Sequence, residues 1–365
     1  MGLVYWSCEI PLVSHNRLNL AHEKISSNRY HNYTDSQYQD YILQGVSRTF
    51  ALTIPQLSKE LVQVVGNAYL WCRMADTIED DPQLALALKG HFSDQLSGLL
   101  TSQESTDAWV TELQPHLHCD TAPAELDLIA NSQRILRLFR AFSPAQQSII
   151  QQCVATMVQG MMHYQAHQPH SGLPNMPAFN DYCYHVAGIV GEMLTLLYCD
   201  YSKGFKDNKA QLMPLSVSFG QGLQMTNILK DIWQDQGREI CWLPQDVFSK
   251  YNIQLQDLSK QRTNPDFHQG VRELVAIAHG HLQDALRYTL LIPKAEQGYR
   301  NFCLWAIGMA LLTLKNIYKQ PDFQQSSQIK ISRNKVKTIF VVTRFIGRSN
   351  SLVKLFFKRI ARDLP

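Results

Sequence analysis

The stretch FGQGLQMTNILKDIWQD at residues 219–235 is the most informative part of this chain. Its apolar residues recur at the three- and four-residue spacing of an α-helix. Its polar residues share one face of that helix: Gln224, Asn227, Asp231 and Asp235. Polar groups on a largely apolar helix need partners, and carboxylates one turn apart repel each other without a cation. We interpret this face as a cation-binding site, and a structural polar network is the alternative.

A second acidic cluster, DTIEDD at residues 76–81, follows an apolar helical stretch. Asp76 and Asp80 lie four residues apart and therefore share a helix face, and Glu79 lies between them. Hard oxygen ligands of this kind suit Mg²⁺, which keeps several of its waters and bridges carboxylates to substrate phosphates. A surface helix that ends in solvated acids is the alternative. Taken together, the two clusters predict an enzyme that handles a diphosphate.

Basic and aromatic side chains accompany both acidic clusters. Arg73 and Tyr69 precede Asp76 on the same helix face. An arginine can form two parallel hydrogen bonds with a phosphate group. Lys230 and Arg238 add positive charge near Asp231 and Asp235. Because a departing diphosphate develops negative charge, these residues support the interpretation.

Two further stretches carry polar residues in apolar surroundings. DYCYHVAGIVG at residues 181–191 contains small residues that permit either close helix packing or room for a long apolar substrate. Tyr182 and His185 are its polar candidates, and the alternative is that both are satisfied core residues. Arg48 lies in SRTF at residues 47–50, where an exposed arginine in a turn is the simpler interpretation.

Three other patterns do not indicate sites. His163, His167 and His170 have metal-like spacing, but they run into a Gly/Pro-rich loop without acidic or cysteine partners, so we do not predict zinc. HLHC at residues 116–119 lies in a predicted loop and is a weaker candidate. The glycines near residue 220 lack the preceding strand and third glycine of a dinucleotide-binding fingerprint.

Helical periodicity runs through most of the 365 residues, and strand patterns are nearly absent. Residues 101–123 and 252–267 are polar enough to be surface loops. Because no linker divides the chain, we predict one all-α domain over residues 1–320, followed by a basic segment over residues 321–365. The predicted helices cover residues 36–45, 57–80, 83–100, 124–140, 144–166, 178–201, 209–235, 266–290 and 296–318.

Cysteine usage and charge distribution indicate where the protein acts. The eight cysteines are scattered and no secretory signal is visible, so we expect reduced thiols and a cytoplasmic protein. No stretch reaches the roughly 20 apolar residues of a spanning helix. From Lys330 onward there are ten basic residues and one acid, interleaved with apolar residues. This amphipathic pattern favours peripheral contact with a membrane over a nucleic-acid partner.

The order of these motifs resembles the squalene/phytoene synthase family over about residues 36–340. The matching pieces are SRTF at 47–50, Arg73 with DTIEDD, residues 181–191, residues 224–235, Arg238 and WLP at 242–244. The resemblance implies an isoprenoid synthase fold, in which helices surround a central substrate cavity. It also implies head-to-head (1′–1) condensation of two prenyl diphosphates that depends on Mg²⁺ or Mn²⁺.

The resemblance assigns roles to individual residues. It implies that Tyr182 has an acid/base or cation-steering role. It implies the metal ligands Asp76, Glu79, Asp80, Asn227, Asp231 and Asp235. It implies diphosphate contacts from Arg48, Tyr69, Arg73, Gln224, Asn227, Lys230 and Arg238. It implies NADPH contacts from Lys330, Arg333 and Lys230.

The branch of the family is a finer question. DTIEDD and the stretch at 301–307 are similar to squalene synthases, as is the segment at 329–331, which resembles their NADPH-contacting segment. The stretches at 71–73 and 182–184 look more like bacterial phytoene and dehydrosqualene synthases. Lys230 replaces the usual arginine, and Ser332 replaces a basic residue expected for NADPH binding.

The function that we predict from the sequence is the conversion of two farnesyl diphosphates to squalene through presqualene diphosphate, with reduction by NADPH. A dehydrosqualene or phytoene synthase that performs no reduction is the alternative. A helical scaffold that binds divalent ions is the alternative outside enzymes.

Overall fold

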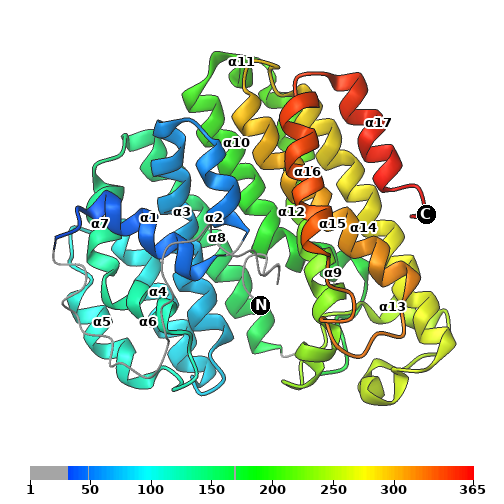
Figure 1. Cartoon of the computed structure of the whole chain (residues 1–365). Helices are drawn as coiled ribbons and strands as arrows, with labels where there is room; N and C mark the ends of the chain where they lie inside the picture. Colours follow the sequence, from blue (N-terminus) through cyan, green and yellow to red (C-terminus); the bar gives the residue numbers. More distant parts are fainter. Residues whose placement is uncertain (1–31, 48, 168–169) are drawn as a thin grey trace.

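The computed structural model describes residues 32–47, 49–167 and 170–365. These residues form an all-helical fold (Figure 1), as predicted; the only β-type contact among them is an isolated bridge between Leu173 and Pro244. The helices of the first part are α1 (Asp35–Val46), α2 (Phe50–Thr53), α3 (Lys59–Asp80), α4 (Leu86–Leu99), α5 (Asp107–Leu113), α6 (Pro123–Ala130), α7 (Ser132–Arg140), α8 (Pro144–Ala166) and α9 (Met176–Cys183). The second part contains α10 (Ile189–Tyr201), α11 (Lys203–Lys206), α12 (Lys209–Gln236), α13 (Gln245–Ser249), α14 (Pro265–Leu291), α15 (Gln297–Lys319), α16 (Arg333–Ile346) and α17 (Asn350–Ile360).

Most predicted helices lie within a few residues of their observed bounds, and local capping explains the best match. Ser143 accepts a hydrogen bond from the Gln146 amide at 3.2 Å, and the Gln146 side chain accepts one from the Ser143 amide at 3.2 Å. With Pro144 in the first turn, this capping box starts α8 at the predicted residue.

Two predictions of secondary structure were wrong in part. The predicted loop at residues 101–123 contains α5, because Trp109 and Leu113 are buried in the core and the Trp109 indole donates to the Phe92 carbonyl at 3.1 Å. The predicted helix at 124–140 is two helices, since Asn131 leaves helical geometry between α6 and α7.

Helix α12 lies at the centre of the fold and packs against α10, α14 and α15 (Figure 1). The approach of α10 to α12 requires glycine. A Cβ atom at Gly191 would lie 2.1 Å from the Ser216 carbonyl oxygen, and one at Gly220 would lie 2.2 Å from the Ala187 carbonyl oxygen. The small residues at 187–191 therefore permit close helix packing.

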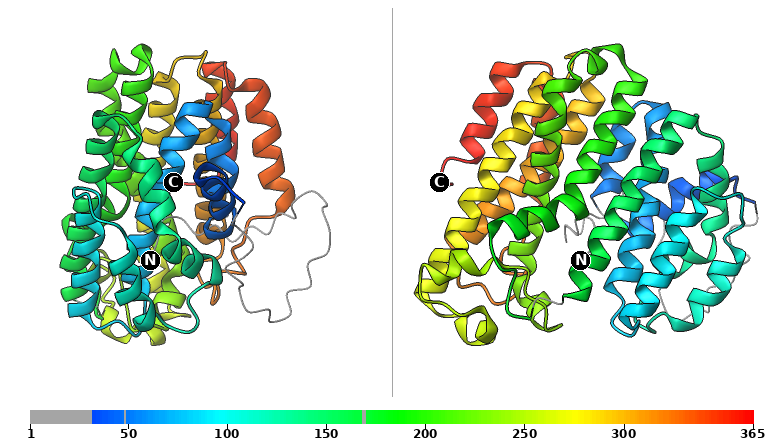
Figure 2. Two further views of the ribbon diagram at one scale, coloured as in Figure 1. Left: turned by 90° about the vertical axis from the view of Figure 1, so that its left-hand side faces the viewer. Right: turned by 180° about the vertical axis from the view of Figure 1, so that it is seen from behind.

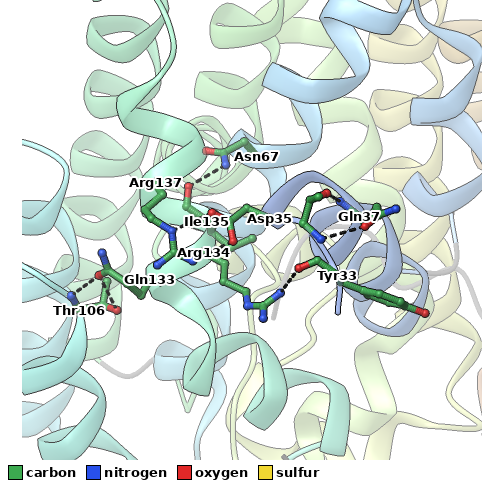
Figure 3. A network of polar contacts seen from close by, with 10 residues as sticks. Tyr33, Asp35, Gln37, Asn67, Thr106, Gln133, Arg134, Ile135 and Arg137 are labelled. Carbon is green, nitrogen blue, oxygen red and sulfur yellow. Dashed lines mark hydrogen bonds and ion pairs between the residues drawn. The ribbon is translucent and has the colours of Figure 1, made fainter. Parts of the chain in front are cut away.

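A polar network fixes α3, the helix that carries Asp76 and Asp80 (Figure 3). Asn67 is fully buried in α3 and donates to the Ile135 carbonyl of α7 at 3.0 Å. Arg137 of α7 forms a bidentate pair with Asp35 of α1, at 2.7 and 2.8 Å. These contacts join α1, α3 and α7, and α8 packs against α3 as well.

The last two helices pack on the outside of α15, at the edge of the molecule (Figure 2). The Phe340 ring of α16 stacks on Trp305 of α15 with ring centroids 3.9 Å apart. No helix in the described part of the chain is long and apolar enough to cross a membrane. The division of the chain at residue 320 stays a prediction.

Candidate active site

Both acidic clusters lie at one cavity of about 460 Å³. Asp80 of α3 lines it from one side, and Asp231 and Asp235 of α12 line it from the other. Arg238 links the two sides, because its Nη1 atom lies 3.7 Å from Asp80 Oδ1. Residues that are far apart in the sequence thus form one acidic site, and Arg238 lies at its edge.

Burial changes the protonation of these carboxyls. Asp76 is 1% exposed and Asp235 is 5% exposed. Burial raises the pKa of Asp76 to about 7, raises the pKa of Asp231 from its ordinary value, and raises the pKa of Asp235 well above its ordinary value. An ionised carboxylate in such surroundings requires a positive partner. A divalent cation would supply that partner and displace the protons.

Several buried polar atoms at this site have no hydrogen-bond partner among the described residues. They are both amide atoms of the Asn227 side chain, Oδ2 of Asp235 and Nε2 of Gln224. Leaving such groups unsatisfied costs about 1–3 kcal/mol each. Asn227 and Asp235 line the main cavity, where a hydrated metal ion with a bound diphosphate would supply their donors and acceptors. Gln224, a predicted diphosphate contact, lines none of the described cavities. The donor set of carboxylate and amide oxygens fits Mg²⁺.

The basic side chains of the cavity are held by carboxylates. Lys230 is 7% exposed, and its Nζ atom lies 3.1 Å from Asp231 Oδ2. Arg73 is 3% exposed, lies 3.7 Å from the Asp76 carboxylate and forms a short ion pair with Glu125 of α6. These cations are thus positioned before any ligand arrives.

Glu125 is a site residue that the sequence analysis missed. Its side chain lines the main cavity and is 9% exposed as a residue. It meets Arg73 from a position 52 residues away in the sequence. Its local sequence is an ordinary first helical turn after a proline, so no sequence signal marks it.

Asp81, the last acid of the stretch DTIEDD at 76–81, orders the rim of the main cavity. One of its oxygens accepts hydrogen bonds from the amides of Gln83 and Leu84, at 2.8 and 3.1 Å. The other accepts the His118 amide at 2.7 Å. Asp81 therefore orders the end of α3 and places His118 and Asp120 at the cavity. The donor atoms of residues 118–120 also lie within 4.8 Å of one another, on a stretch that the sequence analysis discounted.

Tyr182 lies in the core beside the acids. Its hydroxyl is buried without a partner among the described residues, and its ring stacks on Trp242 with centroids 4.0 Å apart. Burial, reinforced by the negative charges of Glu79 and Asp80, raises the pKa of Tyr182 well above its ordinary value. A π-helical turn at Tyr184–Gly188 follows it, a feature frequent at functional sites.

Glu79 points to a neighbouring cavity of about 480 Å³, which shares Asp80, Asp235 and Arg238 with the first. Lys89 also lines this second cavity and donates to the Glu79 backbone carbonyl at the end of α3. Of the six predicted metal ligands, four line the main cavity: Asp80, Asn227, Asp231 and Asp235. Glu79 lines the neighbouring cavity, and Asp76 lines none of the described cavities.

The remaining predicted residues are dispersed. Arg48 lies outside the described residues. Tyr69 is buried and donates to the Val46 carbonyl at 3.2 Å, so it supports the neighbouring backbone and does not line the main cavity. Lys330 and Arg333 line none of the described cavities, although Ser326 of the same connection lines the main one. The Ser332 hydroxyl caps α16.

A separate apolar cavity lies between α10, α12 and α15, with about 60 Å³ of free space. Small residues form part of its wall, including Ala187, Gly191 and Gly220. Phe50, Phe219 and Phe302 add aromatic surface. The small residues at 187–191 thus serve both interpretations, because they allow close helix packing and also line this space.

Comparison with known proteins yields consistent matches. The family model for squalene/phytoene synthases matches residues 43–335. The squalene synthase ERG9 of Candida albicans is 31% identical over 287 residues, which are 77% of this chain and 61% of that protein. The squalene synthase of Cyberlindnera jadinii is 27% identical over 87% of this chain and 70% of its own length.

Solved structures match the fold at low sequence identity. TcSQS in complex with E5700 has a TM-score of 0.73 and 22% identity, covering 91% of this chain and 92% of that chain. A dehydrosqualene synthase in complex with a ligand has a TM-score of 0.61 and 19% identity, covering 89% of this chain and 97% of that chain.

Proposed function

Because this chain belongs to the squalene/phytoene synthase family, we propose that it joins two farnesyl diphosphates head to head and converts the product to squalene. The observation that carries the proposal is the shared cavity, where acids of α3 and α12 lie with Lys230, Arg238 and Arg73. The squalene synthase names of the similar proteins support the choice of substrate. The chain spans 61% of the length of the first of these relatives.

The proposed reaction has two steps. In the first, one farnesyl diphosphate loses its diphosphate, carbon–carbon bonds form to the second substrate, and one proton leaves to give presqualene diphosphate. In the second, the remaining diphosphate leaves, the carbon skeleton rearranges, and hydride from NADPH quenches the cation to give squalene and NADP⁺. Each step separates a diphosphate anion from a carbocation, so the site must stabilise both charges.

Asp76, Asp80, Asp231, Asp235 and Asn227 would hold Mg²⁺ or Mn²⁺. Bound there, the metal would neutralise the diphosphate and assist its departure. Arg73, Lys230 and Arg238 would bind the diphosphate oxygens directly, since a cationic fork or point charge suits them. Arg73 would exchange part of its contact with Glu125 for the ligand. Glu79, which lines the neighbouring cavity, would offer its carboxylate to a metal ion from there.

Tyr182 would act near the carbocation. Its raised pKa keeps the hydroxyl neutral at physiological pH, so it presents a dipole and a proton donor to the reacting carbons. The apolar cavity would receive prenyl carbons and exclude water from the cation. Because its free space is about 60 Å³, side chains would move as a prenyl chain enters.

A second candidate is the same condensation without reduction, which ends in dehydrosqualene or, from geranylgeranyl diphosphate, in phytoene. The observation that favours it is that Lys330 and Arg333 line none of the described cavities. Squalene formation would require the connection between α15 and α16 to move toward the cation when NADPH binds.

The test is product analysis with purified protein, Mg²⁺ and farnesyl diphosphate, with and without NADPH. We expect squalene only when NADPH is present. Asp235→Asn should abolish turnover, whereas Asp94→Asn, an exposed carboxylate on α4, should retain it. Dehydrosqualene in both arms would support the second candidate. Turnover that survives Asp235→Asn would reject the proposed site, and metal binding without turnover would support a scaffold.

We also propose that the segment after residue 320 makes peripheral contact with a membrane, which would receive the apolar product.

A further inference from the structure

Helices α16 and α17 carry the most exposed apolar side chains of the described chain. Val341, Phe345, Leu352 and Leu355 are 55%, 85%, 50% and 66% exposed. The other large hydrophobic side chains that are exposed reach at most 42%. We call these four residues the α16–α17 patch. Val341 and Phe345 lie one turn apart on α16, Leu352 and Leu355 lie one turn apart on α17, and the two helices contact each other. Exposed apolar patches of this kind mark interaction sites.

The patch is separate from the surface by which these helices bind the fold. Ile339 of α16 fits against Gly308 of α15, and Val353 and Phe357 of α17 are buried. Arg300 of α15 donates to the Asn350 side chain at 2.6 Å, and Asn350 donates to the Leu290 carbonyl at 3.2 Å. Both helices are therefore firmly anchored, and the patch faces outward on a fixed support.

The segment that carries the patch is strongly basic. Residues 330–365 contain ten basic residues and one acid. That acid, Asp363, is engaged by Lys315 and Lys319 at 3.0 and 2.9 Å. Except for Arg333, the basic residues form no ion pair with any described residue, and all are exposed. They are Lys330, Lys335, Lys337, Arg344, Arg348, Lys354, Lys358, Arg359 and Arg362.

We propose that the α16–α17 patch docks on an anionic lipid surface, with Phe345 and Leu355 inserted among the acyl chains and the surrounding basic side chains against lipid headgroups. This inference specifies the proposed membrane contact and does not depend on the condensation chemistry. Interfacial helices bind by apolar burial together with attraction to anionic lipids. A second copy of the chain would bring the same positive charge, and a nucleic acid would leave Phe345 without an apolar partner.

The experiment is co-sedimentation of the full chain with vesicles. The vesicles contain either phosphatidylcholine alone or phosphatidylcholine mixed with phosphatidylglycerol. We expect the partition coefficient for the anionic vesicles to fall by about tenfold or more in Phe345→Asp and in Leu355→Asp, because each loses apolar burial and adds repulsion. Tyr201→Asp is the matched control, since Tyr201 is 37% exposed on another helix, and it should bind as the wild type does. Added salt should weaken binding.

Three results would overturn the proposal: anionic-vesicle binding unchanged in both patch variants, equal binding to vesicles of phosphatidylcholine alone, or a dimer in sedimentation velocity that Phe345→Asp dissociates. Melting temperatures of the variants confirm that they are folded. Turnover of farnesyl diphosphate in detergent micelles should be the same in all variants. Vesicle binding therefore tests the membrane proposal, and turnover in micelles tests the proposed reaction, independently of each other.

Discussion

Asp76→Asn should make the metal-free protein more stable at neutral and alkaline pH. Asp76 is buried, and burial raises its pKa from 3.8 to about 7. The folded protein therefore holds this proton more tightly than the unfolded chain does. Stability is unaffected below the unfolded pKa and is lost as pH rises from about 4 to about 7. Asparagine cannot ionise, so it removes that loss.

The expected size follows from the same values. A pKa that is about 3 units higher in the folded protein costs about 4 kcal/mol once the carboxyl is ionised, since each unit is worth about 1.4 kcal/mol. At pH 5 the cost is about 2 kcal/mol. At this pH, Asp76 is protonated in the folded protein and mostly ionised in the unfolded chain. With an unfolding entropy of about 2 cal/mol/K per residue, about 4 kcal/mol corresponds to a melting temperature about 5 °C higher at pH 8. Glu125 still pairs with Arg73 in this variant.

The assay is thermal unfolding in EDTA between pH 5 and pH 8, with Asp94→Asn as the exposed control. Asp76→Asn should melt above the wild type at pH 8, and the difference should shrink toward pH 5. Mg²⁺ should raise the wild-type melting temperature and leave the variant nearly unchanged. A lower melting temperature for Asp76→Asn at pH 8 would refute the reasoning, because it would show that the ionised carboxylate stabilises the fold.

Other contacts predict measurable effects. Glu125→Gln should cost about 1–3 kcal/mol by weakening a buried charge pair; an unchanged urea midpoint would contradict this. Gly220→Ala should cost about 1–3 kcal/mol because its Cβ would lie 2.2 Å from the Ala187 carbonyl. Gly280→Ala on α14 has open space and should be neutral or stabilising in the same melts. Trp233→Phe loses the hydrogen bond from the indole to the Phe323 carbonyl at 2.6 Å, so limited proteolysis should cut residues 320–332 faster; an equal rate would show that this bond does not hold the connection.

The sequence predicts best where the determining contacts are local. The capping box of Ser143 and Gln146 places the start of α8 to the residue, and helical spacing places Asp231 and Asp235 on one face. That the two acidic clusters act together was a hypothesis from the repulsion within each carboxylate pair, and their shared cavity forms only in the folded chain.

Features that depend on distant contacts were not predicted. Glu125 acquires its place from Arg73, 52 residues away. Helix α5 forms in a polar stretch because Trp109 and Leu113 are buried in the core. The loop prediction rested on the average polarity of residues 101–123, which does not register two apolar side chains. Asp81 is the last acid of the stretch at 76–81, yet its two oxygens accept hydrogen bonds from three backbone amides. In each case the role of the residue or helix depends on tertiary contacts, which the local sequence does not reveal.

The central claim is that carboxylates of α3 and α12 act as one metal site for head-to-head prenyl coupling. Its most direct test is gas chromatography with mass spectrometry of the hydrocarbons formed from farnesyl diphosphate and NADPH, in Mg²⁺ and in EDTA, by the wild type, Asp80→Asn and Asp231→Asn. We predict that the wild type forms a C30 hydrocarbon in Mg²⁺ and none in EDTA. Neither variant should form a C30 hydrocarbon under either condition. A C30 product that persists in EDTA, or in either variant, would contradict the account.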